Sequence, residues 1–131
     1  MAGETDLSKM LATLQPQLHE GEYVFCTMEN GRYGDHPELK PIASFMEAEG
    51  LTLVISKLRA DAHNIPYEGV FRGITLSVHS SLAAVGLTAV VATQLAKHAI
   101  SANVIAAYYH DHIFVPAHHA DAALAALQAL V

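Results

Sequence analysis

The sequence predicts an α+β fold built from two short units in tandem. In the second half, apolar side chains, with Arg72 among them, recur at every second position over Val70–Val78. Mostly apolar side chains recur at helical spacing over Leu87–His98. These periods are typical of a strand and of an amphipathic helix. Two more strands are predicted at Asn103–Tyr109 and His112–Pro116, and a last helix at Ala120–Val131. The second half therefore has the order β-α-β-β-α.

The first half repeats this order, with a loop in the place of the first helix. Its predicted elements are a helix over Leu7–Leu14 ended by Pro16, a strand over Tyr23–Met28, a loop over Asn30–Pro41, a hairpin of Pro41–Met46 and Leu51–Ile55, and a helix from Ser56 through His63. Thr5 or Asp6 can cap the first helix, because both side chains accept hydrogen bonds from a helix N-terminus. The resulting β-loop-β-β-α order is a pseudo-repeat of the second half, although the two halves share little sequence identity.

Two details of the second half follow from the same patterns. His110-Asp111 is predicted as a tight turn between the last two strands, because Asp is a common turn residue. The last helix is predicted to pack inward through Ala120, Ala123, Leu124, Leu127 and Val131. These positions recur at three and four residues, the spacing of one helix face.

Length and composition indicate a folded chain of about one domain. The 131 residues are 52% hydrophobic and 15% charged, which excludes a disordered polymer, and one domain takes roughly 100–200 residues. The longest apolar stretch, Leu82–Ala92, is too short to span a bilayer, which needs about 20 apolar residues. We therefore expect two half-size units, residues 1–68 and 69–131, that share one core.

The formal charge of −6 lies in the first half. Residues 1–68 carry five basic and eleven acidic side chains, and residues 69–131 carry two of each. No basic stripe is present, so no nucleic-acid partner is expected, because phosphate binding depends on Lys and Arg. The start of the sequence lacks a secretory signal, and the single Cys26 cannot form an internal disulfide. The sequence thus favours a cytoplasmic protein without a membrane partner, whose nearly uncharged second half packs on the first half or on another copy.

Histidine is unusually frequent, with nine residues in the chain. Four of them, His110, His112, His118 and His119, lie in one stretch that also contains Asp111. Imidazole and carboxylate are good zinc or iron ligands, but adjacent histidines face different directions and no His-x-x-x-His pair is present. We expect no bound metal and no other cofactor; a metal-dependent enzyme using His110, Asp111 and His112 remains the alternative.

Other catalytic arrangements are weakly supported. Ser80 and Ser81 follow His79 directly, yet no Gly-x-Ser-x-Gly motif surrounds them, and residues adjacent in sequence rarely face one another. Cys26 lies within a strand, where a free thiol behaves as a small hydrophobe. Glu47 and Glu49 flank a hairpin turn and are interpreted as solvated. The sequence therefore predicts no catalytic residues and a protein that is not an enzyme.

The start of the helix near Gly86 is the more informative candidate. Backbone N–H groups at a helix N-terminus favour a carboxylate, and glycine lets a ligand approach the backbone closely. Ser101 and Asn103 begin the next strand and are expected to lie close to that turn, where they can bond an amino or amide group. The alternative is that Gly86 only packs and Asn103 only ends a strand.

These residues resemble a known family. The run from Ile74 to Pro116 resembles an ACT domain, the small ligand-sensing module of amino-acid metabolism, through Val85-Gly86-Leu87, Ala99-Ile100-Ser101 and Tyr108–Val115. The whole chain resembles bacterial proteins with two ACT-like units in tandem, akin to the ACT pairs of aspartate kinase and of the arginine-sensing CASTOR proteins. The resemblance implies ferredoxin-like βαββα units in tandem, with an antiparallel sheet and helices on one face.

The resemblance also implies a regulatory module that binds a small metabolite, an amino acid, at the junction of ACT units. We expect it to be a stand-alone module and a homodimer, because the nearly uncharged second half suits an interface. The implied ligand-binding residues are Ser80, Ser81, Val85, Gly86, Leu87, Ser101, Ala102, Asn103, Val104, Tyr108 and Asp111. A module that has kept the fold for oligomerisation and lost the ligand is the alternative.

The sequence departs from the family pattern in two places. Ala99 stands where the family often has Gly, and alanine resists a left-handed conformation. The usual fourth strand after the last helix is missing, which leaves an open sheet edge. We expect a strand of the degenerate N-terminal unit, Tyr23–Met28, to fill that edge by strand exchange.

Overall fold

The chain divides into two units in the computed structural model, which describes residues 3, 6–78, 82 and 85–131. One unit comprises Met1–Glu20 and Arg72–Val131, and the other comprises Gly21–Phe71; we call them the C-terminal unit and the central unit. The division after Phe71 lies close to the expected boundary at residue 68. The N-terminal segment through Glu20, by contrast, lies with the C-terminal strands.

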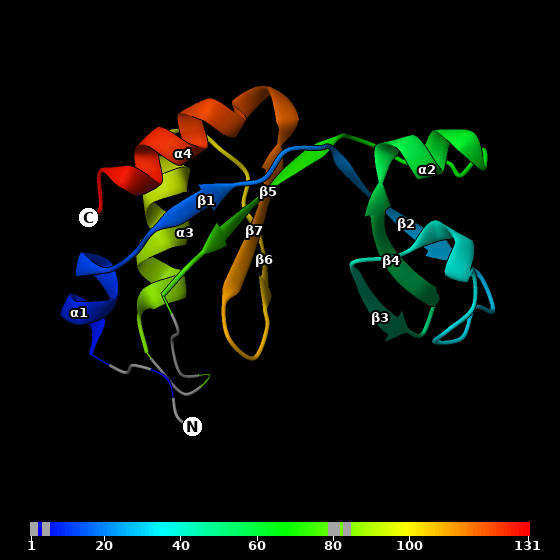
Figure 1. The fold of residues 1–131 in the computed structure, drawn as a ribbon, viewed down its shortest axis with the longest axis horizontal. Coiled ribbons are helices and arrows are strands. Elements are labelled where there is room, and N and C mark those ends of the chain that lie inside the picture. Colours follow the sequence, from blue (N-terminus) through cyan, green and yellow to red (C-terminus); the bar gives the residue numbers. More distant parts are fainter. Residues whose placement is uncertain (1–2, 4–5, 79–81, 83–84) are drawn as a thin grey trace. The chain divides into compact units, whose positions relative to one another are not determined.

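The C-terminal unit combines a sheet with three α-helices (Figure 1). Its elements are α1 (Leu7–Ala12), β1 (Pro16–Leu18), β5 (Phe71–Leu76), α3 (Leu87–Lys97), β6 (Asn103–Ala106), β7 (Asp111–Pro116), the short helix η2 (Ala117–His119) and α4 (Ala120–Gln128). The strands lie in the order β1-β5-β7-β6. β1 runs antiparallel to β5, and β6 runs antiparallel to β7. The predicted order β-α-β-β-α is confirmed.

The core of the C-terminal unit lies between this sheet and its helices. Alternate residues of β5 and β7 supply Ile74, Leu76, Ile113 and Val115, none more than 1% exposed. They form one cluster with Met10 and Leu14 from the N-terminal segment, Leu87, Val91 and Leu95 of α3, and Ala120, Ala123, Ala126 and Leu127 of α4. Val131, predicted on the inner face, is 66% exposed because α4 already ends at Gln128.

The edge of β5 is covered by β1. Pro16–Leu18 pair with Ile74–Leu76, and the backbone N–H of His19 donates to the carbonyl of Gly73 at 2.9 Å. Pro16 is tolerated because it is the first residue of its strand. A strand of the first half fills this edge, as expected, but it is Pro16–Leu18 and not Tyr23–Met28, of which Tyr23 alone pairs with β5, at Phe71.

The turn between β6 and β7 lies earlier than predicted. β6 ends at Ala106 and β7 begins at Asp111, and the N–H of Ala107 donates to the carbonyl of His110 at 3.0 Å. The chain therefore reverses at Tyr108-Tyr109, and Asp111 is a strand residue.

The central unit has the β-loop-β-β-α order that the sequence predicts. Its elements are β2 (Tyr23–Met28), the short helix η1 (Pro37–Leu39), β3 (Ala43–Glu47), β4 (Gly50–Ser56) and α2 (Lys57–Ala62). The strands lie in the order β3-β4-β2, all antiparallel. Ser56 caps α2 by accepting a hydrogen bond from the N–H of Arg59 at 3.2 Å, as the sequence predicts. No helix described in either unit is long and apolar enough to cross a membrane.

The sheet of the central unit has one covered face. Val24, Cys26, Leu51, Leu53 and Ile55 point to the same side and form a cluster with Leu39 of η1 and Ala60 of α2. Leu39, 1% exposed, thus fills part of the space that a helix takes in a complete unit. The alternate residues, in rows such as Thr27–Thr52–Phe45, lie on the opposite face.

Candidate functional site

The first group of candidate residues lies where α3 begins. Gly86 is the N-cap of α3 with φ 104, and a Cβ added there would lie 3.3 Å from Cδ2 of Leu7. Both the positive φ and the tight space favour glycine. Val85 is 84% exposed, whereas Leu87 is 3% exposed and belongs to the core. Ser80 and Ser81 lie outside the described residues, as does His79.

The second group lies at the start of β6. The side-chain amide of Asn103 donates to the carbonyl of Phe114 at 3.2 Å, and the two residues are paired across β6 and β7. Ser101 and Asn103 are exposed, and Ala102 and Val104 are half-buried. Asn103 therefore anchors the strand pair with one N–H and keeps the rest of its amide at the surface.

These two groups lie at opposite ends of the sheet, contrary to the expectation that Asn103 approaches the helix start. Nδ1 of His110 lies 3.2 Å from the carbonyl of Val78, whereas the ring of Phe114 lies against Gly73. Asn103, which is paired with Phe114, therefore lies at the same height along the sheet as Gly73. A strand rises about 3.3 Å per residue, so the five residues from Gly73 to Val78 separate Asn103 from the end at Val78 by about 16 Å. The strand β6 runs toward the start of α3, so its first residue, Asn103, is the residue of β6 that lies farthest from the start of α3.

The third group lies at the β6–β7 turn, at the same end as Val78. Tyr108 is 61% exposed and meets the ring of Tyr109 edge-on at a centroid distance of 5.0 Å. Asp111 is 9% exposed, and its side chain lies on the same face of β7 as the core residues Ile113 and Val115. Burial raises the pKa of the Asp111 carboxyl, against smaller opposing effects of His112 and His110. Among the residues that the structure describes, only these weaker effects oppose the burial of the carboxyl, and such a group favours a cationic group beside it.

A chain of hydrogen bonds on the open face of this sheet was not predicted. Oγ1 of Thr75 lies 2.6 Å from Nε2 of His19 and 2.9 Å from Nδ1 of His112. Burial, followed by the neighbouring His110 and His19, lowers the pKa of His112. The three residues come from β5, β7 and the residue after β1, so no short sequence motif could have shown them.

The histidine stretch forms no metal site in the part of the chain that the structure describes. No group of three or more His, Cys, Asp or Glu side chains is arranged to hold an ion there. The rings of His118 and His119 lie at a centroid distance of 4.0 Å and are tilted by 49° to one another. Cys26 is buried, and burial raises the pKa of its thiol, which lowers the thiolate fraction that a nucleophile needs.

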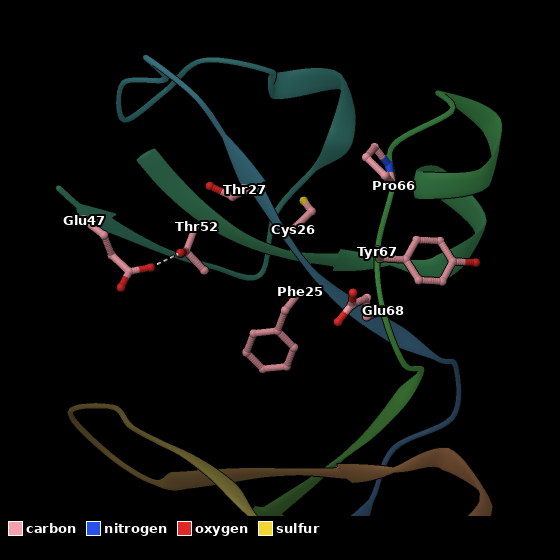
Figure 2. A pocket seen from close by; sticks show the side chains of 8 residues that line it. All are labelled: Phe25, Cys26, Thr27, Glu47, Thr52, Pro66, Tyr67 and Glu68. Atoms are coloured by element: carbon pink, nitrogen blue, oxygen red, sulfur yellow. Dashed lines mark hydrogen bonds between the residues drawn. The ribbon is translucent and has the colours of Figure 1, made fainter. Parts of the chain in front are cut away.

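A separate open pocket, which we call the cavity, lies on the surface of the central unit (Figure 2). Its volume is about 780 Å³, and its lining residues are Phe25, Cys26, Thr27, Glu47, Thr52, Pro66, Tyr67 and Glu68. From the sequence, Cys26 is interpreted as a small hydrophobe within a strand and Glu47 as a solvated side chain. Their partners in the lining come from distant parts of the sequence, so the sequence does not show that they meet.

Two segments of the chain match the same family. Residues 2–72 and residues 70–129 each match the ACT domain, and the first match alone covers more than half of the chain. The chain belongs to the ACT domain family. It holds two ACT domains in tandem, as the resemblance at Ile74–Pro116 implied, and the ferredoxin-like fold class is confirmed.

Solved structures with the same fold include proteins of two kinds. A Vibrio cholerae protein of unknown function, described as a possible transport protein, is 51% identical over 95% of this chain and 94% of its own, with a TM-score of 0.87. An Agrobacterium tumefaciens protein is 13% identical over 89% of this chain and 88% of its own, with a TM-score of 0.69. The ligand-free regulatory subunit of aspartate kinase from Thermus thermophilus is 10% identical over 91% and 98%, with a TM-score of 0.65. The last two show the fold alone. Among curated proteins, none matches this chain.

Proposed function

We propose that this tandem ACT protein is a regulatory module, not an enzyme, that binds an amino acid at a junction of ACT units. The observation that carries the proposal is Asp111, a carboxyl that is 9% exposed at the first position of β7. An ammonium group beside it would offset the desolvation that raises its pKa. A zwitterion carries such a group.

The start of α3 supplies the complementary half of the recognition. The helix has eleven residues and no acidic side chain in its first turn, so its free N–H groups present a partial positive charge. They favour a carboxylate. Asp111 and Gly86 both lie toward the end of the sheet marked by Val78, so one ligand would place its ammonium and carboxylate groups on these two features.

A second copy of the chain would complete the pocket. The start of β6 lies at the far end of the sheet from the start of α3, so in this proposal its residues serve the pocket of a second copy: Ser101, Ala102, Asn103 and Val104. The exposed amide of Asn103 on one copy would face the start of α3 on the other. The ligand-bound protein is therefore proposed to be a homodimer, in which Tyr108 and Val85 border the junction.

Thermal unfolding in the presence of each of the twenty amino acids tests the proposal. A ligand at a hundredfold excess over its Kd stabilises the folded protein by about 2.7 kcal/mol, which raises the Tm. Asp111→Asn should abolish the ligand-dependent rise because the amide carries no charge. Asp121→Asn, at an exposed acid of the first turn of α4, is the matched control and should keep it.

Two results would overturn the proposal. If no amino acid raises the Tm of the unmodified chain, the module that keeps the fold without a ligand becomes the better interpretation. If a ligand binds but light scattering shows a monomer at saturating ligand, the junction between copies is refuted.

A further inference from the structure

The cavity of the central unit has the size of a small-molecule site. Its volume of about 780 Å³ falls within the range of about 300–1,000 Å³ that is usual for ligand pockets, and the cavity is broadly open to solvent. Figure 2 shows Phe25, Thr27, Thr52 and Glu47 on the strands and Pro66, Tyr67 and Glu68 on the segment that follows α2. It is formed wholly within Gly21–Phe71, so it is distinct from the Asp111 region.

Local contacts hold the two walls in place. On the strand side, Phe25 meets the ring of Phe71 edge-on at a centroid distance of 5.4 Å. On the other side, the hydroxyl of Tyr67 donates to Oδ1 of Asp61 at 2.7 Å, and Nζ of Lys57 bonds the second oxygen of that carboxylate at 2.8 Å. The hydroxyl of Tyr67 points away from the cavity in Figure 2. The segment Pro66–Glu68 is thus fastened to α2.

The polar groups of the lining are acids and hydroxyls. Glu47 accepts a hydrogen bond from the hydroxyl of Thr52 across the β3–β4 hairpin, which orients its carboxylate. Glu68 lies on the opposite wall, near Phe25 in Figure 2. The eight lining residues include no Lys, Arg or His, so the site repels anions and attracts cations. Phe25 and Pro66 supply apolar surface between the carboxylates, and the face of an aromatic ring also attracts a cation.

We propose that this cavity binds an organic ammonium compound, a positively charged amine on a small apolar body. Glu47 and Glu68 attract the ammonium group, the hydroxyl of Thr27 accepts one of its hydrogens, and Phe25 contacts the apolar part. The charge of the central unit points the same way, because it carries eight acidic against four basic side chains. This site is additional to the proposed amino-acid site and does not depend on it.

A titration with phenethylammonium, followed by backbone amide chemical shifts, tests the proposal. Phenylacetate, which has the same ring and the opposite charge, is the matched probe. At low ionic strength, where exposed charges are least screened, phenethylammonium should shift the amides of Phe25, Cys26, Thr27, Thr52 and Glu68. Phenylacetate should leave them unchanged.

Two double variants of equal net charge separate the site from the general charge of the chain. Glu47→Gln with Glu68→Gln should weaken binding about tenfold, the size expected for the loss of two partly screened charge contacts. Glu29→Gln with Glu38→Gln, outside the lining, should weaken it much less. All four side chains are exposed, and the amide spectra report directly whether each variant is folded.

The outcomes separate this proposal from the proposed amino-acid site. Asp111→Asn should leave phenethylammonium binding unchanged, because Asp111 belongs to the other unit. Shifts of similar size with both probes, or equal weakening in the two double variants, would refute the ammonium site. Neither result bears on whether an amino acid stabilises the C-terminal unit.

Discussion

Oγ1 of Thr75 lies 2.9 Å from Nδ1 of His112, and on its other side 2.6 Å from Nε2 of His19. A hydroxyl has one hydrogen to donate, so one imidazole nitrogen must accept from Thr75 while the other donates to it. The neutral tautomers of the two histidines are therefore coupled. If both rings were protonated, both nitrogens would donate to one oxygen and neither ring could accept the Thr75 hydrogen.

Replacement of Thr75 by Val should destabilise the protein. Thr75 is 8% exposed, and valine keeps its shape while it removes the bond to each histidine. We expect the free energy of unfolding to fall by about 1–3 kcal/mol, the penalty for unsatisfied polar groups in a largely buried site. Urea denaturation measures the change. Thr93→Val, on the exposed surface of α3, should cost much less, and equal losses in the two variants would contradict this account.

The stability of the protein should fall as the pH drops below neutrality, in part because of His112. Burial, and then His110 and His19, hold the pKa of His112 below its usual 6.5, against a smaller opposite effect of Asp111. The unfolded chain therefore binds a proton first. The stabilisation is present above pH 6.5 and is lost as the pH falls through the folded-state pKa.

Urea denaturation between pH 7.5 and 5, a range of about one unit or more on either side of a free histidine, measures this contribution. His112→Asn keeps an acceptor near the place of Nδ1 and cannot titrate, so its stability should depend less on pH. His118→Asn, at an exposed position, should follow the unmodified chain. Parallel pH profiles for all three proteins would show that His112 is not responsible.

The order of elements was predictable because most elements contain a full repeat of apolar residues at strand or helix spacing. α3 buries Leu87, Val91 and Leu95 at the helical spacing that the sequence shows, and β4 buries most of a continuous apolar run. β1 was missed because its three residues follow a helix and begin with Pro16; its pairing with β5 depends on residues more than fifty positions away. The turn was predicted in the wrong place because aspartate is by itself a common turn residue. In the structure, Asp111 is nearly buried on the same face as Ile113 and is the first residue of β7.

The candidate site was predictable only in part, for a related physical reason. The backbone requirement at Gly86 is local, so the sequence indicated it, and the φ of 104 agrees. The neighbours of Asn103 are set by strand register, which places it beside Phe114 and away from the helix start. The bonds of Thr75 and the lining around Glu47 join segments distant in sequence, which no local pattern reports.

Ala99→Gly should stabilise the protein. Ala99 adopts φ 57 although alanine resists this conformation, because the end of α3 requires it. The N–H of Ile100 donates to the carbonyl of Leu95 and that of Ala99 to Ala96, both at 3.0 Å, the pattern of a Schellman motif. Glycine removes the left-handed strain of about 1–2 kcal/mol but adds entropy to the unfolded chain. We expect a net gain of about 1 kcal/mol by urea denaturation.

The end of α2 provides the control for this prediction. Asn64 has φ 56, and the N–H of Ile65 donates to the carbonyl of Ala60 at 2.8 Å, so the same motif closes both helices. Asparagine tolerates the left-handed region, and Asn64→Gly should therefore gain less than Ala99→Gly. A larger gain at Asn64 would mean that the strain at Ala99 is not what limits stability there.

Gly50→Ala should destabilise the central unit through a backbone clash. Gly50 has φ 155, and a Cβ added there would lie 2.9 Å from the carbonyl oxygen of Met28 and 3.0 Å from Oγ1 of Thr27. Because the carbonyl belongs to the paired strand β2, relief requires the β3–β4 hairpin to move. We expect a loss of about 2 kcal/mol or more, above the cost of φ alone. Gly34→Ala isolates that cost, since Gly34 has φ 89 with nothing within 4 Å of an added Cβ. Urea denaturation should therefore show a larger loss for Gly50→Ala, and the difference measures how rigidly the strands hold Thr27 and Thr52 beside the cavity; equal losses would mean that the hairpin yields and that the cavity wall is soft.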